Sequence, residues 1–173
     1  GKLHIYDKAT LRHLATHTYK GEGWGLTTDG EKLFMSDGTN YIRVLNPETL
    51  AQERRLGVTL RGESLQYLNE LEWIDGHIWA NVYLTDAIVE IDPATGIVIG
   101  FVDLMELRDR LHKNTESEAF NGIAYNTTTG NFYVTGKDWN RFFEIEIIRY
   151  MMNNTLERIN ELLERHILVK DAA

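Results

Sequence analysis

Cysteine is absent from the 173 residues of this chain, and proline occurs only twice. Without cysteine there is neither a disulfide framework nor a thiolate nucleophile. Basic residues are also scarce relative to acidic ones, because 18 Lys and Arg stand against 26 Asp and Glu, for a formal net charge of −8. Proteins that bind nucleic acid usually present a basic face, so the charge argues against a nucleic-acid partner.

Long apolar runs are missing as well. No run approaches the ~18 apolar residues of a membrane-spanning helix, and the sequence opens in strand-like residues rather than with a basic, then apolar leader. We therefore expect no membrane span and no signal peptide in this sequence. The hydrophobic fraction of 43% is enough for the core of a folded domain.

A repeat organises most of the sequence. Trp24 and Asn69 each stand just before the first strand of a unit and are 69 − 24 = 45 residues apart, while Pro47 and Pro93 are 93 − 47 = 46 apart. A third unit covers residues 122–147. Several short antiparallel strands in every ~40–50 residues are typical of propeller blades. The sequence therefore predicts an all-β propeller domain, residues 1–147, with roughly three blades or part-blades.

Three segments complete this organisation. Residues 2–6 and 11–19 read as the last two strands of a blade, so the chain begins in the middle of one. The apolar spacing of residues 104–112 predicts a short helix on the rim of the blades. Residues 148–167 carry an apolar stripe on one helical face. We predict a C-terminal α-helix and tail at 148–173, which either covers part of the sheet or binds a partner.

The segment 68–83 combines acidic, amide and aromatic residues more densely than any other part of the sequence. Its Asp75-Gly76 pair predicts a tight hairpin between two apolar-rich strands. Asn69 and Glu70 beside these aromatics resemble a polar cluster in an apolar pocket, which favours a site. The alternative is that Glu70 and Glu72 are solvated residues on a half-exposed face. The six histidines lack the spacing of a zinc site, so we predict neither a metal site nor an organic cofactor.

Seven short motifs, in this order, resemble those of one enzyme family. They are EGWGLT (22–27), MSDGT (35–39), LNELE (68–72), ANV (80–82), IDP (91–93), FNGIAY (120–125) and VTGKDW (134–139). The family is that of the plant and bacterial type glutaminyl cyclases, also called glutamine cyclotransferases. The resemblance implies a five-bladed, metal-independent propeller enzyme that converts the N-terminal glutamine of peptides into pyroglutamate with loss of ammonia.

The resemblance also implies roles for single residues. Asn69 would hold the substrate by hydrogen bonds, and Lys137 would stabilise the oxyanion as a fixed cation. Glu70 is the acid nearest to them in the sequence and could move the proton if burial raises its pKa, with Glu22 as the substitute. The remaining substrate-binding candidates are Trp24, Tyr83, Asn121 and Trp139.

The chain departs from the family pattern in several places. Asn140 replaces a usual proline, and Tyr83 replaces a common tryptophan. The first blade and a half of the family, with an acidic residue implied in catalysis, has no counterpart here. We therefore expect a homo-oligomer or a missing N-terminal segment. The alternative function is a catalytically inactive, shortened propeller that serves as a binding or structural module. By resemblance the location is secreted or periplasmic.

Overall fold

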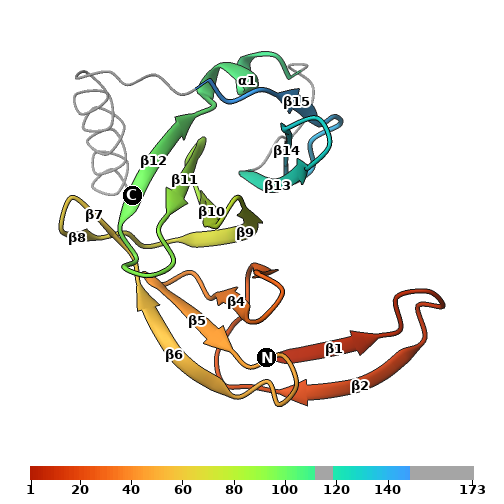
Figure 1. Ribbon diagram of the computed structural model, residues 1–173. Helices are drawn as coiled ribbons and strands as arrows, with labels where there is room; N and C mark the ends of the chain where they lie inside the picture. Colours follow the sequence, from red (N-terminus) through yellow and green to blue (C-terminus); the bar gives the residue numbers. More distant parts are fainter. Residues whose placement is uncertain (112–118, 149–173) are drawn as a thin grey trace, which may run out of the picture.

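The computed structural model describes residues 1–111 and 119–148. This part is built almost entirely of antiparallel strands, which form consecutive small sheets. Figure 1 shows these sheets following one another around an arc, with the first hairpin at one end and the last sheet at the other. The prediction of an all-β, partial propeller is confirmed.

Apart from one small hairpin, each sheet is a blade or part of one, and we name the blades in chain order. The N-terminal hairpin consists of β1 (Lys2–Tyr6) and β2 (His13–Thr18). The first blade consists of β3 (Leu26–Thr28), β4 (Leu33–Ser36), β5 (Tyr41–Leu45) and β6 (Gln52–Gly57). The second blade consists of β9 (Leu68–Ile74), β10 (His77–Val82), β11 (Ala87–Ile91) and β12 (Val98–Asp103). The third blade consists of β13 (Phe120–Asn126), β14 (Asn131–Gly136) and β15 (Phe143–Ile145).

Turn chemistry explains why the strands begin and end where they do. Asp75 and Gly76 both have positive φ angles, of 50° and 86°, and join β9 to β10 in the tight hairpin that the sequence predicts. At other turns a side-chain oxygen accepts a backbone N–H two or three residues ahead, as Asn46 does from Thr49 at 2.9 Å and Asp92 does from Ala94 at 2.8 Å. These turns recur from blade to blade and set the length of the repeat.

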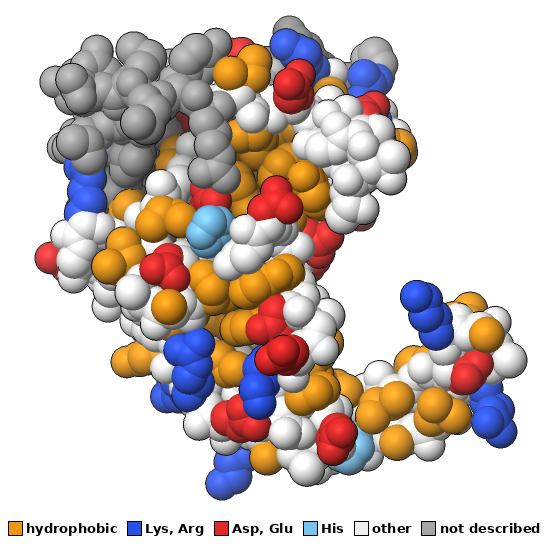
Figure 2. Space-filling view, in the orientation of Figure 1, with side chains coloured by type: hydrophobic (Ala, Val, Ile, Leu, Met, Phe, Trp, Pro, Cys, Tyr) orange, Lys and Arg blue, Asp and Glu red, His pale blue; other side chains and the backbone are white. Residues whose placement is uncertain are grey.

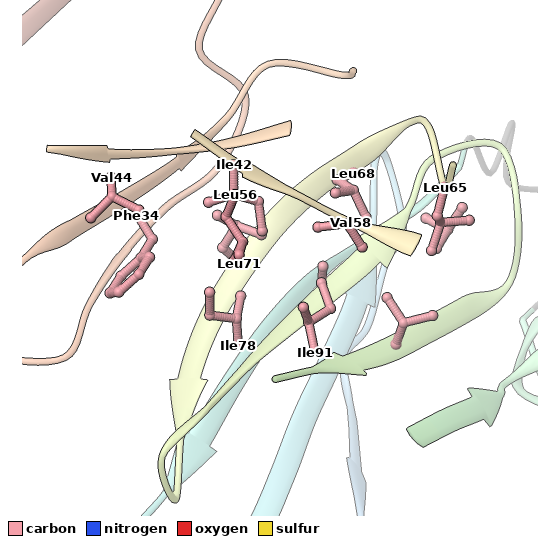
Figure 3. Close-up of a cluster of buried hydrophobic side chains, with 13 residues drawn as sticks. Phe34, Ile42, Val44, Leu56, Val58, Leu65, Leu68, Leu71, Ile78 and Ile91 are labelled. Carbon is pink, nitrogen blue, oxygen red and sulfur yellow. The ribbon is translucent and has the colours of Figure 1, made fainter. Parts of the chain in front are cut away.

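Two hydrophobic clusters hold neighbouring blades together. The first lies between the first and second blades, where Phe34, Ile42 and Leu56 face Leu71 and Ile78 (Figure 3). The second lies between the second and third blades, where buried side chains of β9 and β10 meet those of β13 and β14. The innermost strands β3, β9 and β13 are consequently neighbours. The ends of these inner strands come close together, which matters for the site described below.

Three details concern the segments outside the blades. The predicted rim helix is present as α1 (Met105–Asp109). The connection between the first and second blades contains a small hairpin that the sequence did not predict, formed by β7 (Thr59–Leu60) and β8 (Glu63–Ser64). The predicted C-terminal helix at 148–167 lies outside the described residues except for Ile148, which is not helical.

In the described ranges, no helix has the length and apolar character that crossing a membrane requires. The N-terminal hairpin nevertheless exposes large hydrophobic side chains, since Tyr6, Leu11 and Leu14 are 53%, 75% and 51% exposed. In Figure 2 this hairpin projects from the body of the molecule and carries hydrophobic side chains on its surface.

Candidate active site

Five of the residues singled out in the sequence lie at one end of the blades. Trp24 comes just before inner strand β3, Asn69 lies at the start of β9, and Asn121 lies at the start of β13. Tyr83 directly follows β10, and Lys137 directly follows β14. In each antiparallel pair, the start of the inner strand lies beside the end of the next strand. All five residues therefore belong to the same rim of the propeller.

Three of them, one from each blade, form a cluster. The rings of Trp24 and Tyr83 meet edge to face, with centroids 5.5 Å apart and planes at 74°. The Nζ atom of Lys137 lies 5.1 Å from the centroid of the Tyr83 ring, within the range of a cation–π contact. Both rings are half-buried while Lys137 is exposed. The cluster therefore presents two aromatic walls and one cation at the rim.

The Trp24 ring is held by two features of the first blade. Gly38 has a φ of +81°, and a Cβ at that position would come within 2.5 Å of Trp24 Cη2, so the ring rests directly on the glycine backbone. The indole Nε1 donates a hydrogen bond of 2.6 Å to Glu22 Oε2. Glu22, the substitute acid in the sequence analysis, thus orients an aromatic wall.

Asn69 is fixed at the junction of the first and second blades. It is 6% exposed, and its carbonyl oxygen accepts a hydrogen bond of 2.5 Å from the hydroxyl of Ser36, which is fully buried. The same hydroxyl accepts a hydrogen bond of 2.8 Å from the backbone N–H of Gly25. Gly25 is required here, because a Cβ would lie 2.1 Å from the Asn69 carbonyl oxygen.

A similar link joins the second and third blades. The buried Asn81 accepts a hydrogen bond of 2.9 Å at Oδ1 from the backbone N–H of Gly122. The backbone N–H of Glu70 donates to Asn121 Oδ1 at 3.4 Å. Asn121 therefore supports the strand that carries Asn69 and Glu70.

Ser36 and Asn81 lay within quoted motifs, but sequence reasoning assigned them no role. They are 81 − 36 = 45 residues apart, which is the spacing of Trp24 and Asn69. Both are polar residues at the same position of the repeat, where the sequence predicts the buried end of a strand. This recurrence was the signal that could have identified them.

Glu70 has the electrostatics of a group that exchanges protons near neutral pH. Burial raises its pKa from 4.5 to about 7, and the nearby charge of Glu72 adds to the effect. Burial also raises the pKa of Glu72. A hydrogen bond from the backbone N–H of Tyr125 lowers this pKa, but the effect of burial is larger. A carboxyl group with a pKa close to the working pH is suited to general acid–base catalysis. The condition that the sequence analysis set for Glu70 is met.

Trp139 packs against the second hydrophobic cluster. Its ring rests on Gly136, where a Cβ would come within 2.3 Å, and its centroid is 5.6 Å from that of Phe120. The Cζ atom of Arg108 lies 6.0 Å from the Trp139 ring centroid. The structure thus groups Trp139 with the core of the third blade, two residues along the chain from Lys137.

Over residues 1–111 and 119–148, His, Asp and Glu side chains form no group of three or more that could hold a metal ion.

Comparisons with known proteins are consistent with each other. Residues 1–147 match the family model described as glutamine cyclotransferase. A glutaminyl-peptide cyclotransferase of Arabidopsis thaliana is 38% identical over 128 residues, which are 73% of this chain and 40% of that protein. The crystal structure of Myxococcus xanthus glutaminyl cyclase matches with a TM-score of 0.73 at 38% identity, over 78% of this chain and 59% of that one. The chain thus spans less than two thirds of the length of either relative.

Proposed function

This chain belongs to the glutamine cyclotransferase family, and from that premise we propose that it acts as a glutaminyl-peptide cyclotransferase. In this reaction the α-amine nitrogen of an N-terminal glutamine attacks the carbonyl carbon of its own side-chain amide. A carbon–nitrogen bond forms, the bond to the amide nitrogen breaks, and that nitrogen leaves as ammonia. The product is an N-terminal pyroglutamate.

The aromatic walls supply the geometry for ring closure. The glutamine side chain must fold back so that its two reacting ends meet, and holding reacting groups in place can lower a barrier by several kcal/mol. Trp24 and Tyr83, in edge-to-face contact at 5.5 Å, offer flat surfaces for a short aliphatic chain. We assign them this clamping role, with the amides of Asn69 and Asn121 holding the polar ends of the substrate.

The cation supplies electrostatic stabilisation. When the amine adds to the amide carbon, the amide oxygen becomes an oxyanion, and a fixed positive charge stabilises it. Lys137 has this role in the proposal. The observation that carries the proposal is its position, because its Nζ lies 5.1 Å from the Tyr83 ring at the edge of the aromatic walls.

A carboxyl group completes the proton transfer. The attacking nitrogen loses a proton as the new bond forms, and the leaving amide nitrogen needs a proton to depart as ammonia. A single group that accepts the first proton and donates the second is sufficient. Glu70 is our candidate, because its pKa of about 7 lets it do both at neutral pH.

The proposal is tested by substrate selectivity. Peptides that begin with glutamine should release ammonia in the presence of the protein. The same peptides with an acetylated N-terminus should not, because the acetylated nitrogen is no longer nucleophilic. Equal ammonia release from both peptides would indicate simple amide hydrolysis, and no release from either would count against the enzyme reading.

One observation favours a second candidate, a binding module without turnover. The side chains of Trp24, Tyr83 and Lys137 are in contact, and a surface of two aromatic rings and a cation can bind a peptide without any proton transfer. This reading expects a glutamine-initiated peptide to bind, with Lys137 and Trp24 needed for affinity, while no ammonia is released. Calorimetric binding measured beside the ammonia assay separates the two functions.

We further propose, from family resemblance alone, that the protein works outside the cytoplasm, either secreted or in a periplasm. Fractionation of the source cells tests this location.

A further inference from the structure

The side chain of Arg108, on α1, contacts both the loop that carries Tyr83 and the loop that carries Lys137. We infer that Arg108 is a positioning residue, which fixes the loop at 83–86 against the loop at 137–142 so that the Tyr83 ring and the Lys137 ammonium stay together. For catalysis this inference rests on the proposed function, whereas the positioning itself does not.

The first half of the link is an ion pair with Asp86, at the end of the Tyr83 loop. Arg108 Nε lies 2.9 and 3.0 Å from the two carboxylate oxygens of Asp86, and a terminal guanidinium nitrogen lies 2.5 Å from Oδ1. Such two-point contacts fix orientation as well as distance. The backbone supports the same position, because the N–H of Leu104 donates to the Asp86 carbonyl oxygen at 2.8 Å.

The second half of the link is the contact with Trp139. The guanidinium carbon of Arg108 lies 6.0 Å from the Trp139 ring centroid. Trp139 is itself anchored, because its ring rests on Gly136 and its backbone N–H donates to the Gly136 carbonyl oxygen at 3.2 Å. That hydrogen bond closes the turn that contains Lys137. Arg108 therefore touches the anchored end of each loop.

This link matters because the two loops come from different blades. Tyr83 follows the second strand of the second blade, and Lys137 follows the second strand of the third. Their contact of 5.1 Å depends on how the two loops sit against each other. A misplacement of about 1 Å at a reacting centre can cost about 100-fold in rate. A rigid connection between the loops is therefore worth more to catalysis than its half-buried position suggests.

The test compares the full 173-residue chain with three single variants of it. These are Arg108→Met, Arg108→Lys and the matched control Lys32→Met. The control removes a different ion pair, Lys32–Glu53 at 2.7 Å, at the opposite end of the first blade. The first readout is the NMR shift of the Lys137 CH2 group beside its amine, which the Tyr83 ring displaces. The signal is assigned by its disappearance in Lys137→Arg.

We expect Arg108→Met to abolish the ring-induced shift, Arg108→Lys to keep part of it, and Lys32→Met to leave it unchanged. Turnover of a glutamine-initiated peptide should fall about 100-fold in Arg108→Met, mainly in kcat, with partial rescue in Arg108→Lys. If Arg108→Met does not fold, Asp86→Asn removes the same ion pair and is expected to reduce the shift. A folded Arg108→Met or Asp86→Asn variant that keeps the full Lys137 shift overturns the inference. A parent chain without turnover defeats the proposed function, and the Lys137 shift then still decides the role of Arg108.

Discussion

The ammonium nitrogen of Lys137 lies 5.1 Å from the centre of the Tyr83 ring, although the two residues belong to different blades and are 137 − 83 = 54 positions apart. Trp24, from a third sheet, packs edge to face against the same Tyr83 ring. Three blades thus contribute one residue each to a single point on the rim.

Replacing Lys137 by alanine removes the cation from the cluster. If Lys137 stabilises the oxyanion, kcat should fall by the ~10²–10³ typical of one lost oxyanion donor, while KM changes little. Steady-state kinetics on a glutamine-initiated peptide measure both constants. The control Lys32→Ala removes a lysine at the opposite end of the first blade and should leave both constants unchanged. Turnover that survives Lys137→Ala would remove Lys137 from the mechanism.

Replacing Gly38 by alanine places a methyl group within 2.5 Å of the Trp24 ring. We expect this change to displace the ring and to lower the free energy of unfolding by about 1–3 kcal/mol for overpacking, in addition to the strain of a positive φ. Gly30→Ala is the matched control, because Gly30 has a φ of +93° with open space around it. Urea unfolding of both variants isolates the clash with Trp24. Equal losses in the two variants would mean that the ring does not depend on Gly38.

Replacing Glu70 by glutamine should change how stability depends on pH. The folded-state pKa of Glu70, about 7, lies above its ordinary value of 4.5, so the folded chain binds this proton more tightly than the unfolded chain does. The stability that this proton provides is complete below about pH 4.5 and is lost as the pH rises through about 7. Glu70→Gln should therefore gain in Tm relative to the parent as the pH rises from 5 to 8.

The control for this experiment is Glu31→Gln, at an exposed turn, whose Tm difference from the parent should stay constant over the same range. If Glu70 also transfers the proton, Glu70→Gln should lose turnover at every pH. A Tm difference for Glu70→Gln that is flat between pH 5 and 8 would show that the carboxyl group is not perturbed by burial.

The N-terminal hairpin, β1 and β2, favours self-association of the chain. Within the described ranges β1 pairs only with β2, and an unpaired strand edge beside exposed hydrophobic side chains favours pairing with another chain. We expect self-association at micromolar concentration by light scattering. Leu14→Lys should weaken it, whereas Ile99→Lys, at a similarly exposed position of β12, should not. A monodisperse monomer with a sharp melt would contradict this prediction.

Much of the fold could be predicted because its signals are local. The Asp75-Gly76 turn and the recurring Asn and Asp turns set strand ends, and the repeat spacing follows from them. The inter-blade links could not be predicted in the same way, because each depends on partners far apart in the sequence. Ser36, for example, bonds to a carbonyl oxygen 33 residues away.

In the candidate site, too, residues could be named from local sequence signals, whereas contacts between distant residues could not. Lys137 and Trp24 were named from motifs and Tyr83 from the family resemblance, but the contacts among the three depend on how three blades pack. Trp139 was named as a substrate-binding candidate together with Trp24, and its packing on Gly136 and Phe120 could be seen only in the structure. The part played by Arg108 was hidden, because a single arginine at the end of a short helix has no sequence signal of its own.

The most direct test of the account follows the nitrogen atoms. A peptide whose N-terminal glutamine carries ¹⁵N only in the side-chain amide is incubated with the protein, and both products are analysed by mass spectrometry. Cyclisation predicts that all released ammonia carries the label and that the peptide retains its α-nitrogen in a pyroglutamate ring. The reaction should be slowed ~10²–10³-fold by Lys137→Ala and unchanged in Lys32→Ala. A peptide product that contains glutamate in place of pyroglutamate, or a peptide that binds and is recovered unchanged, would contradict the account.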